Sequence, residues 1–165
     1  MRKILTLACA AALVPAAPAP AAATRDVDLP QLFARQLERA RLQTTIPILL
    51  PQTLRSDFRR HFPEGRAAAG AWRFAIGAAR GCNSATACFI AEFRGIRGRS
   101  PSSRRTVRLA RGRTGFYRPS RCGASCSPPR IQWRERRTRY TIEAKVRGRR
   151  PLVRMANSAI RNGPR

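Results

Sequence analysis

Residues 71–97 read AWRFAIGAARGCNSATACFIAEFRGIR, and they predict two β-strands joined by a loop that begins and ends in cysteine. Apolar side chains occupy every second position along both arms, which is the period of a strand with one buried face. They are Trp72, Phe74, Ile76 and Ala78 on the first arm, and Phe89, Ala91 and Phe93 on the second. A bond between Cys82 and Cys88 would close the loop at the turn of this hairpin.

Further short strands are predicted downstream of the hairpin, because apolar and polar residues alternate there as well. They span 106–110, 114–118, 131–134 and 140–146. The last two are joined by a short connection, 135–138, and should form a second hairpin. Successive strands with short connections favour an antiparallel meander that buries one face.

Helices are predicted at both ends of this run of strands. Residues 24–44 carry apolar side chains at helical spacing, with Asp28 as the N-terminal cap and Pro30 in the first turn. Near the C-terminus an apolar face recurs over 152–160, after Pro151 and before a stop at Gly163.

Two segments between the first helix and the 71–97 hairpin carry weaker patterns. Residues 45–50 are apolar but include Pro47, which favours an edge strand or an extended arm. Residues 52–70 are polar and basic and are expected to be irregular. The sequence therefore predicts an α+β fold, a curved antiparallel sheet of about five strands with an N-terminal and a C-terminal helix.

Residues 1–23 have the three-part pattern of a secretory signal peptide: a basic start, an apolar run and a small-residue stretch that ends at Ala23. The alternative is a lipoprotein signal that uses Cys9, although the run before Cys9 is very short. We expect cleavage near Ala23 and a secreted or periplasmic product without a transmembrane span. The remainder should comprise the helical lead-in, 24–44, packed on a single α+β domain, 45–165.

The chain is strongly basic, with 34 Lys and Arg residues against eight Asp and Glu and a formal net charge of +26. Signal cleavage removes Arg2 and Lys3 and leaves Lys145 as the only lysine. A GC-rich genome would explain the preference for arginine, but it does not explain the shortage of acids. Charge of this size repels itself unless counterions or a polyanionic partner relieve it. A solvated surface and a polyanion-binding surface both remain open.

Four cysteines follow the predicted signal: Cys82, Cys88, Cys122 and Cys126. An even number in an exported chain indicates disulfides, for which three pairings are possible. We favour the two local pairs, 82 with 88 and 122 with 126, since each brackets a turn-like segment. A four-thiolate zinc site is the alternative, but neither pair has the spacing of a zinc knuckle. No Cys-x-x-Cys redox motif occurs.

Few residues suggest catalysis. His61 follows Asp57 by four residues, so that the two could meet on a helical turn, but no nucleophile is marked beside them. Glu92 and Glu143 could face one another across the sheet, as the carboxylate pair of a glycoside hydrolase would. Both lie on the expected wet face of their strands, and we predict no enzyme activity, no cofactor and no metal.

Three segments carry a resemblance to known proteins: WRFAIGAARGCNSATACFIAEFRG, GRTGFYRP, and IQWRERRTRYTIEAKV with LVRMANSAI. They resemble small uncharacterised exported proteins of bacteria and the sheet-and-helix lipoprotein-type domains of the bacterial envelope, over residues 45–162. The resemblance rests on aromatic residues, turn glycines and cysteines. It implies a fold and supplies no catalytic residue.

The sequence predicts an exported, non-catalytic envelope protein that associates with anionic lipid head groups, anionic glycan or extracellular nucleic acid. Intracellular nucleic acid is not expected, because of the signal peptide and the absence of a recognition motif. An interaction or assembly module with an envelope protein partner is the alternative. The arginine surplus is densest in 94–113 and 134–139. The residues predicted to bind a polyanion are Arg94, Arg97, Arg99, Arg104, Arg105, Arg111 and Arg113.

Overall fold

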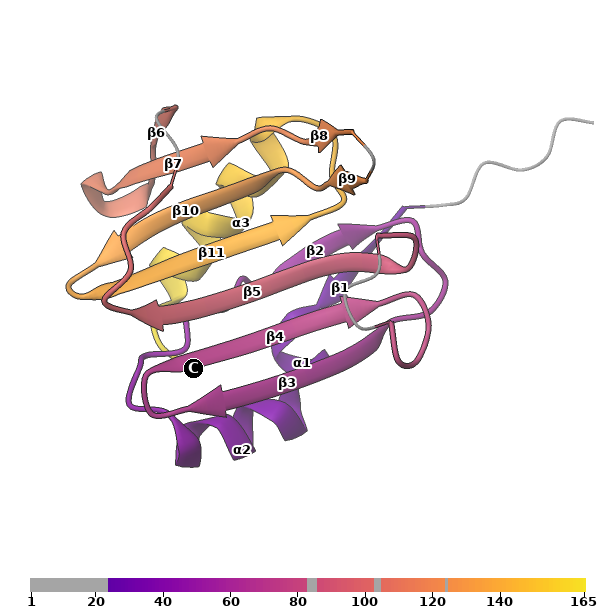
Figure 1. Ribbon diagram of the computed structural model, residues 1–165. Helices are drawn as coiled ribbons and strands as arrows, with labels where there is room; N and C mark the ends of the chain where they lie inside the picture. Colours follow the sequence, from indigo (N-terminus) through magenta and orange to yellow (C-terminus); the bar gives the residue numbers. More distant parts are fainter. Residues whose placement is uncertain (1–23, 83–85, 103–104, 124) are drawn as a thin grey trace, which may run out of the picture.

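The computed structural model describes residues 24–165 except 83–85, 103–104 and 124 (Figure 1). The predicted signal peptide therefore lies outside the described residues. The chain forms an α+β structure around a seven-stranded antiparallel sheet, with order β3-β4-β5-β11-β10-β7-β6. Its strands are β3 (Phe62–Ala68), β4 (Ala71–Gly77), β5 (Phe89–Arg97), β6 (Thr106–Arg108), β7 (Thr114–Arg118), β10 (Arg130–Glu135) and β11 (Thr138–Ala144).

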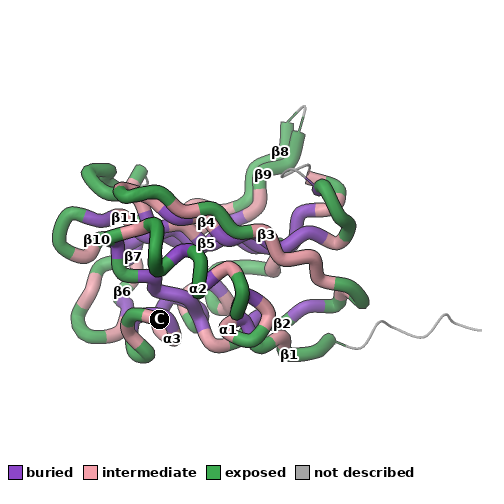
Figure 2. Tube along the Cα trace, turned by 90° about the horizontal axis from the view of Figure 1, so that it is seen from below, coloured by how far each residue is buried: buried purple, intermediate pink, exposed green. Residues whose placement is uncertain are grey.

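Two smaller antiparallel pairs accompany this sheet. Strands β1 (Arg25–Asp28) and β2 (Thr53–Ser56) pair with each other, as do β8 (Arg121–Cys122) and β9 (Cys126–Ser127). The helices are α1 (Leu29–Leu32), α2 (Ala34–Gln43) and α3 (Arg149–Asn162), and a short 3-10 turn, η1, spans Ala110–Gly112. Helices α1 and α3 lie with β1 and β2 on one side of the sheet, whereas α2 runs along β3 (Figure 2).

The predicted hairpin 71–97 is present as β4 and β5, with Phe74 opposite Phe93 and Ile76 opposite Ala91. The side chains that alternate inward along β4 are buried against the helices. Phe33, directly before α2, stacks on Phe74 at 5.2 Å between ring centroids. Gly95 is required opposite Trp72, because any side chain there would collide with the indole ring.

The predicted hairpin between 131 and 146 is confirmed as β10 and β11, and the C-terminal helix as α3, which ends at Gly163 as expected. Both local disulfides are present, Cys82–Cys88 and Cys122–Cys126. Residues 45–50 form an extended arm. Its Ile46, Ile48, Leu49 and Leu50 are buried in the core.

Two predictions of the fold were wrong in detail, the irregular stretch 52–70 and the size and order of the sheet. The predicted irregular stretch 52–70 contains β2 and β3. Strand β2 pairs with β1, which is distant in sequence, and β3 pairs with β4 across a tight turn. The predicted N-terminal helix begins at Leu29, directly after its predicted cap, and is divided at Phe33 into α1 and α2. Asp28 does cap it, by accepting a hydrogen bond from the backbone N–H of Gln31 at 2.8 Å. The capping prediction for Asp28 is thus confirmed.

The sheet is also larger than predicted and is not a simple meander. After β5 the chain crosses to the far edge, forms β6, and returns through β7 and β10 to β11, which pairs with β5. Two antiparallel runs therefore meet at the β5–β11 ladder. This ladder sets Thr138 opposite Arg97 and brings the two arginine-rich segments of the sequence to the same end of the sheet.

Candidate anion-binding site

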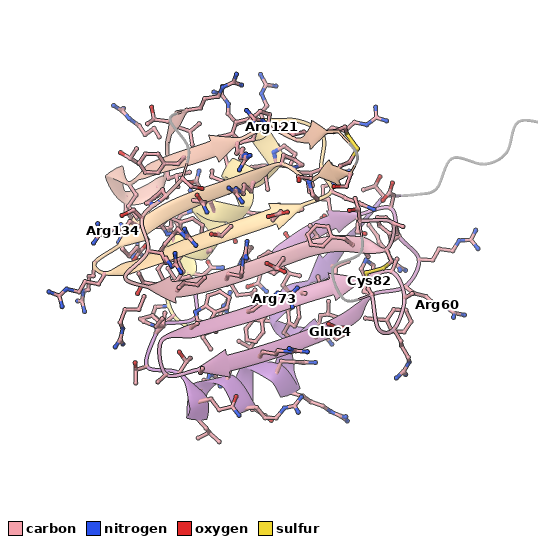
Figure 3. The ribbon with its side chains drawn as sticks, in the orientation of Figure 1. Arg60, Glu64, Arg73, Cys82, Arg121 and Arg134 are labelled. Carbon is pink, nitrogen blue, oxygen red and sulfur yellow. A yellow bond between two sulfur atoms is a disulfide. The ribbon has the colours of Figure 1, made fainter. Side chains whose placement is uncertain are left out.

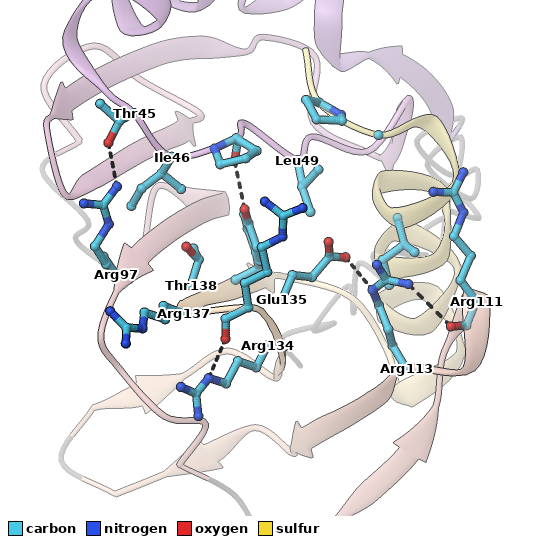
Figure 4. Close-up of a pocket in the computed structure, with 16 residues that line it drawn as sticks. Thr45, Ile46, Leu49, Arg97, Arg111, Arg113, Arg134, Glu135, Arg137 and Thr138 are labelled. Carbon is cyan, nitrogen blue, oxygen red and sulfur yellow. Dashed lines mark hydrogen bonds and ion pairs between the residues drawn. The ribbon is translucent and has the colours of Figure 1, made fainter.

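A cleft of about 890 Å³ opens at the end of the sheet where β5 stops and β10 turns into β11 (Figure 4). Its other walls are the arm that follows α2 and the C-terminal end of α3, including Ile160 and Gly163. We call this feature the arginine cleft. Its cationic residues are Arg97, Arg111, Arg113, Arg134, Arg136 and Arg137.

The charge of the arginine cleft is strongly unbalanced. Glu135 is the one acidic residue among the described residues that line it, against six arginines. Arg113 holds that carboxylate, with its Nε 2.7 Å from Glu135 Oε1. Five formal positive charges thus remain in one concave surface, where an anion would relieve their mutual repulsion.

Several of these guanidinium groups are held in place by a single bond. Arg97 donates to the hydroxyl of Thr45 at 2.6 Å, and Arg111 donates to the backbone oxygen of Arg161 at 3.0 Å. Arg134 Nε donates to the backbone oxygen of Arg136 at 2.9 Å. A guanidinium carries five N–H donors. One internal bond therefore orients each side chain and leaves other donors for an anion.

The turn between β10 and β11 puts two further arginines at the mouth of the cleft. Glu135 pairs with Thr138, so Arg136 and Arg137 form the two-residue tip of the hairpin. Arg136 adopts φ 51°, as a tight hairpin turn requires. Gly98 donates its backbone N–H to Arg137 O at 2.7 Å, which ties the tip to the end of β5.

The floor of the cleft is apolar and firmly packed. Tyr140 is 2% exposed, and its hydroxyl donates to the backbone oxygen of Pro47 at 3.1 Å. The indole of Trp72 donates to the same oxygen at 3.3 Å. Burial raises the pKa of Tyr140 to about 12, and nearby Glu135 adds to the rise. The phenol therefore stays neutral and supports the floor.

The cleft contains three of the residues predicted to bind a polyanion: Arg97, Arg111 and Arg113. Arg94, Arg99 and Arg105 do not line it. Arg94 lies within the sheet, Arg99 is exposed in the loop after β5, and Arg105 is exposed just before β6. Arg104 lies outside the described residues.

Arg94 belongs to a different surface, the face of the sheet opposite the helices, which we call the open face. Figure 3 views this face, on which Glu64 and Arg73 are labelled. Glu92 is 7% exposed and accepts from Arg73 Nε at 2.6 Å, while its other oxygen lies 2.7 Å from Arg94 Nε. Glu143 lies opposite Glu92 in the ladder, and its carboxylate is 3.8 Å from Arg94.

The expected meeting of Glu92 and Glu143 across the sheet is thus confirmed. Arg94, however, lies between the two carboxylates. Burial raises the pKa of Glu143, Arg94 opposes that rise, and Glu92 adds to it. The pair is part of an ion-pair network.

Two other arginines of the open face hold the loop that follows β5. Arg139 donates to Ser100 O and Arg130 donates to Ser102 Oγ, each at 3.0 Å. Ser102 also donates its backbone N–H to Gln132 at 2.9 Å. Burial lowers the pKa of both arginines, and neighbouring guanidinium groups add to the effect. These arginines stabilise the crossover that leads to β6.

No hydrogen bond or ion pair joins the described side chains of His61 and Asp57. His61 Nε2 lies 3.0 Å from the hydroxyl of Ser56, and burial together with the charge of Arg25 lowers the pKa of His61.

In the described part of the chain, no group of three or more His, Cys, Asp or Glu side chains is arranged to hold a metal ion. No helix among the described residues is long and apolar enough to cross a membrane.

The predicted site residues omitted Arg134, Arg136 and Arg137, although the run 134–139 stood out in the sequence as arginine-rich. Its position beside Arg97 depends on the β5–β11 ladder, which joins segments about forty residues apart. Arg134, Arg136 and Arg137 could have been assigned to the site only by predicting that β5 pairs with β11.

No protein-family model, no curated protein and no solved structure matches the chain.

Proposed function

We propose that this chain is an exported, non-catalytic envelope protein that binds anionic envelope material through the arginine cleft. The observation that carries the proposal is the cleft itself: six arginines and one carboxylate around an apolar floor. Arginine binds phosphate and carboxylate groups in bidentate fashion, so both are candidate ligand groups. The ligand is therefore an anionic lipid head group, an anionic glycan or extracellular nucleic acid.

Export is supported by two features. The N-terminal 23 residues have the pattern of a signal peptide, and two disulfides are formed in the folded chain. Disulfides persist mainly in oxidising compartments outside the cytoplasm. Cleavage near Ala23 would leave the chain from residue 24 onward as the mature protein.

A high net charge alone gives salt-sensitive binding to any polyanion. The test must therefore separate the cleft from the rest of the surface. The oxidised chain from residue 24 would be titrated with long-chain polyphosphate, polygalacturonate, duplex DNA, vesicles of anionic phospholipid and neutral dextran. Each titration would be run at low and at physiological salt.

The decisive variant is Arg134→Gln, Arg136→Gln and Arg137→Gln combined. Its matched control is Arg35→Gln, Arg39→Gln and Arg41→Gln on exposed positions of α2, which removes the same charge. At physiological salt we expect the cleft variant to lose at least about tenfold in affinity for one probe, or about 1.4 kcal/mol, while the control keeps it. Equal losses in both variants, or binding that vanishes for every probe at physiological salt, would contradict the proposal.

A further inference from the structure

The two edges of the seven-stranded sheet differ in how they are protected. An antiparallel strand bonds to its neighbour through alternate residues, so at an edge the remaining residues point their backbone groups outward. Such groups are a template for another strand unless the protein blocks them. The edges here are β3 and β6.

The β3 edge is blocked. Ala68 and Ala71 close the tight turn to β4, so Pro63, Gly65 and Ala67 are the residues that point outward. Pro63 has no N–H, and its oxygen accepts from Gln36 Nε2 of α2 at 3.2 Å. Gly65 lies so close to Gln36 that an added Cβ would come within 2.6 Å of its side chain. Helix α2 therefore occupies this edge.

The β6 edge is open. Leu109 donates to Arg113 O at 2.8 Å, and Tyr117 donates to Arg105 O at 2.8 Å. These two bonds show that Arg105 and Leu109 direct their backbone groups toward β7. Because successive residues of a strand alternate in this direction, the backbone groups of Thr106 and Arg108 point away from β7. Both residues are exposed. Among the described residues, no backbone group bonds to the outward N–H or C=O of Thr106 or Arg108.

A groove of about 620 Å³ runs between this edge and the first turns of α3. Val107 and Val153 give it an apolar base. Its charged residues are Arg108, Arg149, Arg150 and Arg154, and no acid is among the residues that line it. Asn157 of α3 accepts from the backbone N–H of Ala110 at 2.6 Å, which fixes the end of the edge to the helix.

We propose that β6 binds an extended acidic segment of a partner protein as an added strand. The segment would bond to the outward groups of Thr106 and Arg108, as in other β-strand additions. Side chains on one of its faces would pack on Val107 and Val153, and its carboxylates would meet the arginines of the groove. This site is separate from the arginine cleft, whose lining residues it does not share.

A capped hexapeptide of alternating Glu and Val is the first probe, since it carries both the charge and the extended tendency. The comparison probe has the same sequence with N-methyl groups on alternate residues, which removes the donors along one edge and keeps the charge. The N-methyl groups can be placed on the three Glu residues or on the three Val residues, which gives two comparison peptides. We expect one of the two to bind at least tenfold more weakly than the unmodified peptide, measured by calorimetry. The amide NMR signals of Thr106 and Arg108 should shift on binding of the unmodified peptide.

The protein variants complete the test. Thr106→Pro removes one outward N–H without removing a ladder bond and should weaken binding at least tenfold, whereas Thr106→Ala should not. Arg149→Gln with Arg150→Gln should also weaken binding, while Arg35→Gln with Arg39→Gln should not. If the N-methyl peptides bind as well as the parent and the signals of β6 do not move, the attraction is undirected charge and the proposal is wrong. Because the N-methyl comparison uses the unaltered protein, it stands even if Thr106→Pro disturbs the fold.

Binding of this peptide should survive the triple substitution in the arginine cleft. Polyanion binding should likewise survive Thr106→Pro. Failure of one site would therefore be visible separately from failure of the other.

Discussion

The open face and the arginine cleft are both rich in arginine, yet their arginines have different partners. On the open face Arg73 and Arg94 bond to the buried carboxylate of Glu92. Arg130 and Arg139 bond to the loop that crosses to β6. The positive charge of this face is used to hold the fold together.

In the cleft, Arg113 is the only arginine with a carboxylate partner among the described residues, and that partner is Glu135. The bonds of Arg97, Arg111 and Arg134 go to a hydroxyl or a backbone oxygen, which orients the guanidinium groups without neutralising them. A count of arginines does not separate the two surfaces. What separates them is a shared carboxylate: on the open face Arg73 and Arg94 both bond to Glu92, whereas five of the six arginines that line the cleft bond to no acidic side chain of the described residues.

The largest effect should come from breaking the network of the open face. Glu92→Gln removes a buried charge that two arginines share, and we expect a loss of about 2–3 kcal/mol in the free energy of unfolding. The loss is below that of a fully buried pair because Arg73 and Arg94 are about a third exposed, at 32% and 30%. Urea denaturation of the oxidised protein would measure it.

Glu38→Gln on the exposed side of α2 is the matched control, and it should change the free energy of unfolding by less than about 0.5 kcal/mol. Equal stability of the two variants would mean that Glu92 does not organise the open face. The open face would then no longer differ from the cleft in having its arginines held by a carboxylate.

The second prediction concerns anions as stabilisers of the cleft. A ligand that binds only the folded state adds stability, about 1.4 kcal/mol at ten times its Kd. We expect pyrophosphate to raise the thermal midpoint of the unaltered protein. The increase should be strongly reduced by Arg134→Gln, Arg136→Gln and Arg137→Gln combined.

Arg73→Gln on the open face should lower stability but retain the increase with pyrophosphate. A smaller increase in this variant, matching that of the cleft variant, would show that pyrophosphate responds to total charge. The distinction between paired and unpaired arginines would then have no functional meaning.

The same contrast shows what sequence reasoning could reach. The hairpin 71–97 was predictable because Trp72, Phe74 and Ile76 alternate within a few residues, and both disulfides because each joins nearby cysteines. Strand β3 was not, since FPEGRAA contains no β-branched residue and Gly65 is needed for the close approach of Gln36. There the tertiary packing overrides local preference.

The site was half predictable for a similar reason. Arg97, Arg111 and Arg113 stood out through local density. The contribution of Arg136 and Arg137 required knowledge that β11 pairs with β5, and no local pattern encodes that long-range choice. Arg94 was predicted to bind polyanions, but its position in the ladder gives it two carboxylates of the protein itself.

A smaller effect should separate the floor of the cleft from its rim. Tyr140→Phe removes the hydrogen bond to Pro47 O, which still accepts from Trp72. We expect a loss of about 0.5–1 kcal/mol in the free energy of unfolding, with unchanged affinity for polyanions at the rim. Urea denaturation and the polyphosphate titration together would check this, and a loss of affinity without loss of stability would assign the hydroxyl to the ligand.

The smallest effect should be a pH dependence that belongs to the open face. The pKa of Glu143 is raised from 4.5, with burial as the main cause, so the folded state binds its proton more tightly than the unfolded chain does. The unfavourable contribution of ionised Glu143 is fully present above its folded-state pKa. It is relieved as the pH falls through that value toward 4.5. The free energy of unfolding of the unaltered protein, relative to Glu143→Gln, should therefore rise as the pH is lowered from 7 to 4.5. A relative stability that stays constant or falls over this range would mean that Arg94 and Arg130 outweigh burial, and that the open face neutralises Glu143 fully.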